Sequence, residues 1–171
     1  ALGVSPVAHG RLRGLDLATV RAAPGVVDVI VAADLHGVND VGPIVHDDPI
    51  LAETELHFAG QPVFAVAATS VDAARRAATL ARLDVEPLPA ILTIDEALAA
   101  QSYVLPPVHL ERGNAAAALA RAPHCLRGEV RSGGQDHFYL EGQIALAVPR
   151  EAGGMQVFTS TQHPGEVQHM V

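Results

Sequence analysis

The segment from Thr159 to Gln162 has the residue types of a binding site for an uncharged polar group. Three hydroxyl side chains follow one another, and the amide of Gln162 then offers a hydrogen-bond donor and an acceptor without a charge. Such an amide suits recognition of a polar ligand atom where burying a charge would be costly. The alternative is a network that caps a helix expected to begin at Pro164, and the residues alone favour this cap.

A second polar cluster consists of Asp136, His137 and Glu141, which flank the apolar residues 138–140. A carboxylate near a histidine can orient or charge the imidazole. The same groups can instead form a buried, hydrogen-bonded support, which is the interpretation that the pattern favours. The preceding Gly-Gly pair (133–134) predicts a turn or β-bulge and lacks the glycine spacing of a phosphate-binding loop.

The nine histidines and the single cysteine do not form a metal-binding pattern in the sequence. There is no His-Glu-x-x-His motif, and His163 and His169 are six residues apart, so they do not share one helical face. The single Cys125 excludes an internal disulfide and is expected to be a small buried apolar residue. A reduced, cytoplasmic setting is therefore expected.

The chain has 171 residues, 49% hydrophobic and 18% charged, enough for one domain or two small ones with a buried core. Its net charge of −8 argues against binding to nucleic acid or to an anionic membrane surface. No apolar run approaches the roughly 20 residues needed to cross a bilayer. Both ends, Ala1 and Val171, lie in apolar sequence, and we expect the chain to be part of a longer polypeptide.

Alternating strand and helix patterns predict an α+β unit in the first hundred residues. Strands are expected at 11–16, 26–31, 61–68 and 83–86, and the second and third of these should be buried because they are apolar between turn signals. Helices are expected at 17–23, 71–81 and 94–100, capped by Asp16, by Ser70 and by the pair Thr93 and Glu96. The turn-rich stretch 37–48 should be an exposed loop.

The proline pair at 106–107 predicts a linker, and we place the two domains at residues 1–104 and 105–171. Beyond the linker, a helix is expected at 114–120, strands at 125–131, 143–148 and 155–160, and a last helix from 164. The turn 151–154 should join the last two strands into a hairpin. Gln162 would then follow the end of its second strand.

Four stretches resemble the molybdenum-binding (large) subunit of bacterial xanthine dehydrogenase. GGQDHFYLEGQIALAVP (133–149) and TSTQHPGEVQHMV (159–171) resemble its molybdopterin-binding domain. LDLATVRAAPGVVDVIVAADL (15–35) and HFAGQPVFAVAATSVDAARRAA (57–78) resemble the hammerhead α/β domain that precedes it. The implied fold is a hammerhead domain over 1–104 and the start of a molybdopterin-binding domain over 105–171. The wider molybdenum hydroxylase family includes aldehyde oxidases and carbon monoxide dehydrogenases.

This resemblance implies an oxidoreductase of purine metabolism, which hydroxylates hypoxanthine and xanthine to urate with a molybdopterin cofactor. Electrons would pass through 2Fe–2S clusters and FAD on a partner subunit to NAD, in a heterotetramer with two copies of each subunit. The family's S-T-Q pattern falls on Gln162, which would bind the cofactor by a hydrogen bond to a ligand of the molybdenum. The catalytic glutamate, the substrate-binding arginine and a glycine-rich loop are expected after Val171. No catalytic residue is therefore expected here, and neither Glu141 nor Glu166 matches the glutamate motif.

Two other functions stay open. An aldehyde oxidase-like hydroxylase of the same family would share the cofactor and differ in substrate. A non-catalytic module would only dock the iron–sulfur/flavin subunit. The stretches HFYLEG (137–142) and STQHP (160–164) favour the xanthine dehydrogenase branch.

Overall fold

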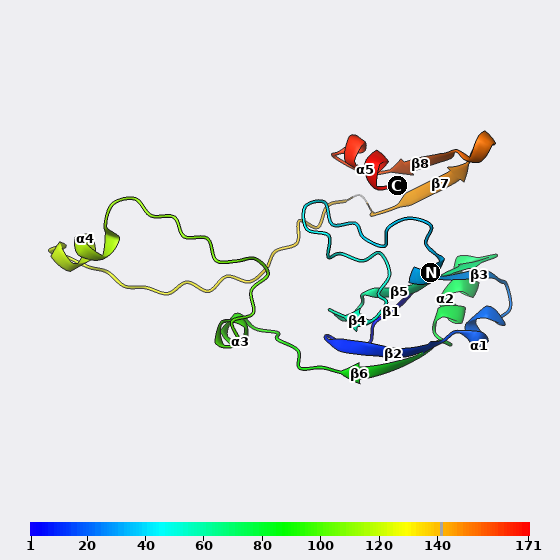
Figure 1. Cartoon of the computed structure of the whole chain (residues 1–171), viewed down its shortest axis with the longest axis horizontal. Helices are drawn as coiled ribbons and strands as arrows, with labels where there is room; N and C mark the ends of the chain where they lie inside the picture. The colour runs from blue at the N-terminus through cyan, green and yellow to red at the C-terminus, as the bar shows by residue number, and fades with distance from the viewer. Residues whose placement is uncertain (141) are drawn as a thin grey trace. The chain divides into compact units, whose positions relative to one another are not determined.

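The computed structural model describes residues 1–140 and 142–171 and contains both helices and sheets, as predicted for an α+β protein (Figure 1). The described residues form two units, Ala1–Pro106 and Pro107–Val171. No helix in these ranges is long and apolar enough to span a membrane. The predicted boundary after residue 104 stays a prediction.

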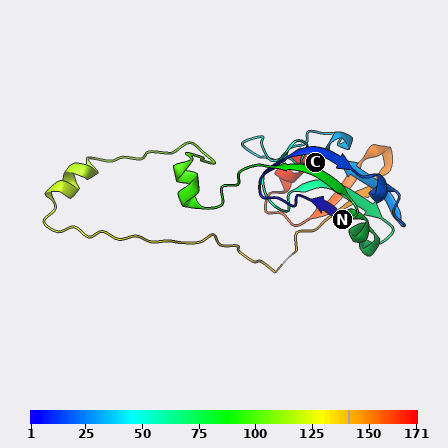
Figure 2. The same cartoon turned by 90° about the horizontal axis from the view of Figure 1, so that it is seen from below.

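The first unit contains two antiparallel three-stranded sheets, with strand orders β1–β5–β3 and β4–β2–β6. Their strands are β1 (Leu2–Val4), β2 (Gly10–Asp16), β3 (Val26–Val31), β4 (Glu55–Leu56), β5 (Pro62–Ala68) and β6 (Arg82–Pro87). The helical segments are α1 (Ala18–Arg21), the 3₁₀ turn η1 (Ala32–Asp34), α2 (Val71–Ala78) and α3 (Ile94–Ala99). Figures 1 and 2 show β2 running beside β6, and the four predicted strands of this unit are confirmed.

Strand β5 is the middle strand of its sheet, and Val63, Phe64 and Val66 on it are buried. Neighbouring residues of a strand point to opposite faces, so the burial of both Val63 and Phe64 means that both faces are covered. This explains why the sequence of β5 is apolar without alternation. In β3, by contrast, Val29 is buried while Val27 is 72% exposed. The prediction of a buried strand therefore holds for the central part of β5, although Ala67 is exposed, and for one face of β3.

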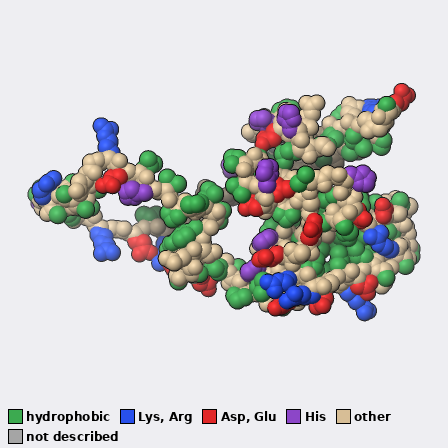
Figure 3. All heavy atoms as spheres, in the orientation of Figure 1, with side chains coloured by type: hydrophobic (Ala, Val, Ile, Leu, Met, Phe, Trp, Pro, Cys, Tyr) green, Lys and Arg blue, Asp and Glu red, His purple; other side chains and the backbone are tan. Residues whose placement is uncertain are grey.

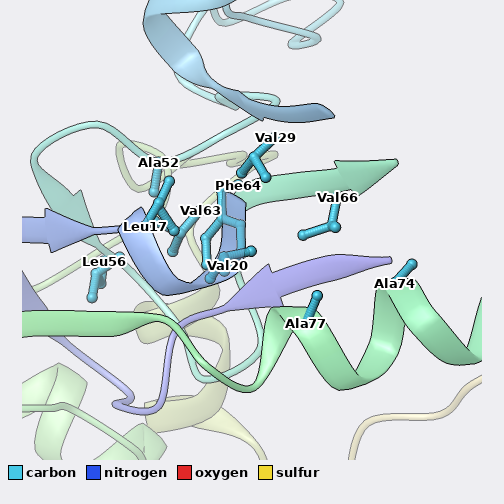
Figure 4. Close-up of a cluster of buried hydrophobic side chains, with 10 residues drawn as sticks. All are labelled: Leu17, Val20, Val29, Ala52, Leu56, Val63, Phe64, Val66, Ala74 and Ala77. Atoms are coloured by element: carbon cyan, nitrogen blue, oxygen red, sulfur yellow. The ribbon is translucent and has the colours of Figure 1, made fainter. Parts of the chain in front are cut away.

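The core of the first unit is built where α1 and α2 pack on this sheet (Figure 4). Ser70 caps α2 as predicted, because its Oγ accepts a hydrogen bond of 3.1 Å from the amide of Ala73. Alanines on one face of α2 are buried, so the helix can lie close to the strands. The buried side chains shown in Figure 4 are Leu17, Val20, Val29, Ala52, Leu56, Val63, Phe64, Val66, Ala74 and Ala77.

The starts of the short helices α1 and α3 differ in their capping. The N-cap of α1 is Leu17, which makes no side-chain cap bond, so the predicted Asp16 cap is one residue off; Asp16 Oδ1 accepts from the amide of Ala18, and α1 is shorter than predicted. At α3 the predicted capping box is confirmed: Thr93 Oγ1 accepts from the amide of Glu96 at 3.2 Å, and Glu96 Oε2 accepts from the amide of Thr93 at 3.0 Å. Helix α3 buries no residue, so the capping box contributes to its stability without support from a buried face.

The second unit contains α4 (Ala115–Arg121), β7 (Ala145–Pro149), the turn η2 (Glu151–Gly153), β8 (Met155–Thr159) and α5 (Pro164–Met170). Asn114 Oδ1 caps α4 by accepting from the amide of Ala117 at 2.8 Å. Strands β7 and β8 form the predicted antiparallel hairpin, in register from Ala145 opposite Thr159 to Pro149 opposite Met155. The predicted hairpin and the helix beginning at Pro164 are therefore confirmed.

The strand predicted at 125–131 is wrong, because these residues have no regular secondary structure. A β-strand needs a neighbour for its backbone hydrogen bonds, and β-pairing in the described part of this unit is confined to β7 and β8. The side chains of Leu126 and Val130 are exposed. Cys125 is also exposed, which contradicts its expected burial.

Candidate functional site

The loop between β8 and α5 is held in place by short-range hydrogen bonds. Thr161 Oγ1 accepts from the amide of His163 at 3.0 Å, and His163 Nδ1 accepts from the amide of Glu166 at 3.1 Å. His163 thereby caps α5, while Pro164 occupies the start of the helix, where its missing N–H costs nothing. The predicted capping network exists, and it uses Thr161 and His163.

Gln162 lies at a bend in this loop and its side chain is exposed. Strand β8 ends at Thr159, earlier than expected, because its partner β7 begins at Ala145, directly opposite. Across residues 1–140 and 142–171, no hydrogen bond involves the Gln162 side chain, whereas both of its neighbours are engaged. Its amide donor and acceptor are thus available to a ligand, and the capping alternative does not account for this residue.

A groove of about 460 Å³ lies between β8 and α5, next to this loop. Thr159 and Thr161 line it together with Gln168, so hydroxyl and amide groups meet an otherwise apolar wall. Met155, Val157 and Thr159 alternate along β8 and therefore face the groove from the same side of the strand. The sequence analysis missed Gln168; the period-two spacing on β8 was the signal for this face.

The second polar cluster does not form a buried support. Asp136 and His137 are exposed, and Asp136 Oδ1 accepts a local hydrogen bond from the amide of Phe138 at 3.2 Å. Glu141 lies outside the described residues. The Gly-Gly pair at 133–134 lies in an exposed segment without a turn or a strand, so the predicted turn or bulge is wrong.

The donor groups around Gln162 fit hydrogen bonding and do not fit direct metal coordination. Thr159, Thr161, Gln162 and Gln168 are neutral donors and acceptors. No group of three or more His, Cys, Asp or Glu side chains in the described ranges is arranged to hold a metal ion. This donor set fits contact with a ligand of a metal that other groups hold.

Comparison with known proteins agrees with this architecture. Residues 1–89 match the family described as "Aldehyde oxidase and xanthine dehydrogenase, a/b hammerhead domain", and residues 97–171 match "Molybdopterin cofactor-binding domain". Residues 1–89 of the first unit thus form a hammerhead domain of the molybdenum hydroxylase class. The chain belongs to the aldehyde oxidase and xanthine dehydrogenase family, and the molybdenum cofactor is the cofactor of its second matched domain.

Individual relatives support the same family. The chain is 42% identical to xanthine dehydrogenase of Drosophila pseudoobscura pseudoobscura over 99% of its length, and 40% identical to aldehyde oxidase 1 of Macaca fascicularis over 96%. It spans 13% and 12% of the length of these two relatives. Quinoline 2-oxidoreductase of Pseudomonas putida 86 matches 99% of this chain with 24% of its own, with 27% identity and a TM-score of 0.83. The chain is therefore similar to oxidoreductases over almost its whole length.

Proposed function

We propose that this chain is part of the molybdenum-binding portion of a xanthine dehydrogenase that converts hypoxanthine and xanthine to urate. The observation that carries the proposal is the 42% identity to a xanthine dehydrogenase over 99% of the chain. The molybdenum cofactor, when bound, supplies the oxidative hydroxylation chemistry. This chain contributes groups that position what binds there, and no catalytic residue of its own.

Within this proposal, Gln162 binds the cofactor by a hydrogen bond to a ligand of the molybdenum. Its amide has no competing partner within the described part of the chain, and it carries no charge. Thr161 and His163 hold the loop on either side of it. A positioned amide of this kind orients a polar atom at lower desolvation cost than a charged side chain.

The electron path and partners are a further part of the proposal. The 2Fe–2S clusters and FAD are assigned to a partner subunit, and NAD is the final acceptor. The single cysteine of this chain supports that assignment, because such clusters are usually held by four cysteines. We also propose that the remainder of the molybdenum subunit and the iron–sulfur/FAD subunit complete a heterotetramer. The cytoplasmic setting stays a prediction.

An aldehyde oxidase-like activity is the second candidate. It is favoured by the 40% identity to aldehyde oxidase 1, which is close to the value for xanthine dehydrogenase. Steady-state turnover of hypoxanthine and of an aromatic aldehyde by the full-length protein separates the two. Turnover of the aldehyde without turnover of hypoxanthine would replace the first proposal with the second. A fully assembled preparation that lacks molybdenum would favour the non-catalytic docking module.

Replacing Gln162 by Ala tests its role. We expect turnover per bound molybdenum to fall by about ten- to a thousandfold, because a positioned hydrogen-bond donor near the reacting groups is lost. The matched control is Gln156→Ala: this amide bonds to Arg150 and lies on the opposite face of β8 from the groove. Unchanged turnover of Gln162→Ala, normalised to molybdenum content, would remove Gln162 from the site.

A further inference from the structure

His9 connects three segments of the first unit that are far apart in the sequence. Its Nδ1 lies 2.7 Å from the carbonyl oxygen of Pro89, and its Nε2 lies 3.0 Å from Glu55 Oε1. The backbone adds a third bond, since the amide of Leu88 donates to the carbonyl oxygen of His9 at 3.0 Å. His9 therefore ties the segment that leaves β6 both to the loop before β2 and to β4.

Both partners of the His9 ring only accept hydrogen bonds. A backbone carbonyl has no proton to give, and an ionised carboxylate has none either. A neutral imidazole carries one N–H, so it can make one of these two bonds but not both. With Glu55 ionised, both ring nitrogens can donate at these distances at the same time only in the imidazolium form of His9.

The charges around His9 agree with this protonation state. The bond to the Pro89 carbonyl and then the bond to Glu55 raise the pKa of His9 above its ordinary value of 6.5. The bond from His9 lowers the pKa of Glu55, helped by the nearby charges of His57 and Arg11. Arg11 is itself paired with Glu86 on β6.

The surroundings of Glu55 are acidic as well. It lines a hollow of about 280 Å³ together with Asp40, Asp47 and Glu53. Figure 3 shows histidine and acidic side chains gathered where β2 begins. The segment 88–90 (Leu-Pro-Ala) brings no titratable group, so the protonation changes at the clamp are those of His9 and Glu55, with His57 as a further titratable neighbour of Glu55.

We propose that His9 is a proton-dependent clamp between the segment leaving β6 and β4: loss of the His9 proton breaks one of its two ring bonds, so the ring no longer joins Pro89 to Glu55 and this segment is held more loosely. Pro89 is the last residue that matches the hammerhead domain, and the molybdopterin-binding match begins at residue 97. The clamp thus acts on the exit of the hammerhead domain. Because the pKa of His9 is raised by folding, the clamp is complete below about pH 6.5 and is lost as the pH rises through the higher pKa of the folded state.

Hydrogen exchange of the Leu88 amide in the full-length protein tests this clamp. Mass spectrometry with fragmentation that isolates this amide follows it from about pH 6 to about pH 8.5, corrected for intrinsic chemical exchange. We expect its protection to fall roughly two- to tenfold over this range. This is the change expected from losing one hydrogen bond at a half-exposed site, where solvent weakens the interaction. Amides within β6 that pair with β2 should not respond.

Two variants and one control test whether His9 and Glu55 cause the pH dependence. His9→Gln should abolish the pH dependence at Leu88, because a glutamine amide does not titrate. Glu55→Gln should move the midpoint to lower pH, because it removes the carboxylate that stabilises the imidazolium. His46→Gln is the matched control: His46 lies 3.5 Å from Asp40 in the same unit, and no contact with the segment 88–90 involves it within the described residues.

Protection at Leu88 that is independent of pH in the wild type would overturn the clamp. The same holds if His9→Gln keeps the full pH dependence, or if Glu55→Gln leaves the midpoint unchanged. The Glu55 variant also decides the question if the His9 variant does not fold.

Discussion

Replacing Gly3 by Ala should destabilise the first unit through a clash with one identified side chain. Gly3 on β1 lies directly opposite Phe64 on β5 in the antiparallel register. A Cβ atom at Gly3 would overlap Cε1 and Cζ of the Phe64 ring and would lie 2.6 Å from Cδ1. Phe64 is 1% exposed and belongs to the core, so its ring has no solvent to move into.

The expected cost follows from this geometry. Adding a methyl group to a well-packed core forces side chains off their rotamers or shifts the backbone, at typically about 1–3 kcal/mol. If β1 separates from β5 in a local opening, this cost corresponds to roughly 5- to 150-fold faster exchange of the β5 amides. Hydrogen exchange of the native full-length protein, compared with the wild type, measures this ratio.

Gly14→Ala is the matched control. Gly14 also lies in a strand, β2, but the nearest atom to its Cβ position is Asp84 Cβ at 3.5 Å, an ordinary van der Waals contact. This variant should exchange within about twofold of the wild type, as expected for a substitution that disturbs no packing.

A double-mutant cycle identifies Phe64 as the cause. Phe64→Leu removes the Cε1 and Cζ atoms and should cost about 2 kcal/mol, from the loss of about three buried carbons. In this background Gly3→Ala should cost clearly less than it does alone. If Gly3→Ala alone leaves β5 exchange unchanged, or costs the same in both backgrounds, the reasoning is wrong.

Two further predictions concern helix caps. Ser70→Ala removes the oxygen that accepts from the amide of Ala73, and exchange of the α2 amides should report a loss of about 1 kcal/mol, whereas Thr79→Ala, at the other end of the helix, should not affect the first turn. Hydrogen bonds from the amide of Leu92 and from Thr93 lower the pKa of Glu96 below its ordinary value of 4.5. Because the folded-state pKa is the lower one, this contribution to α3 is complete above about pH 4.5 and is lost as the pH falls through the folded pKa. Nuclear magnetic resonance of the α3 amides should show fraying of this helix at the low pH values in the wild type. In Glu96→Gln this acid-dependent step should be absent. If both proteins gave the same pH profile, the role assigned to Glu96 would be contradicted.

The sequence alone determined the features that depend on near neighbours along the chain. Ser70 and the pair Thr93 and Glu96 cap helices where they were expected, because a cap involves atoms only two or three residues apart. Asn114, expected as the first residue of its helix, instead caps α4. The apolar run of β5 correctly predicted a buried strand, and the structure shows that both of its faces contribute buried residues. The turn signal at 151–154 correctly predicted where the chain reverses direction between β7 and β8. The resemblance to the molybdenum hydroxylase family also depended on short sequence stretches, those at 15–35, 57–78, 133–149 and 159–171.

Tertiary structure decided the features that need a partner from elsewhere in the chain. The residues 125–131 have the composition of a strand but no strand beside them, and composition does not reveal whether a partner exists. The end of β8 was misplaced because the start of β7, and not the apolar pattern of β8, determines the last paired residue. Gln162 therefore lies in a loop, with its amide unpaired in the described structure.

The clearest case is His9, which carries no signal in its own neighbourhood. Its partners are 46 and 80 residues away, and the fold of two antiparallel strand pairs brings them within hydrogen-bond distance. The residue types specify which groups can donate and which can accept. Whether two acceptors lie within hydrogen-bond distance of the same imidazole depends on strand register, which is a property of the folded sheet.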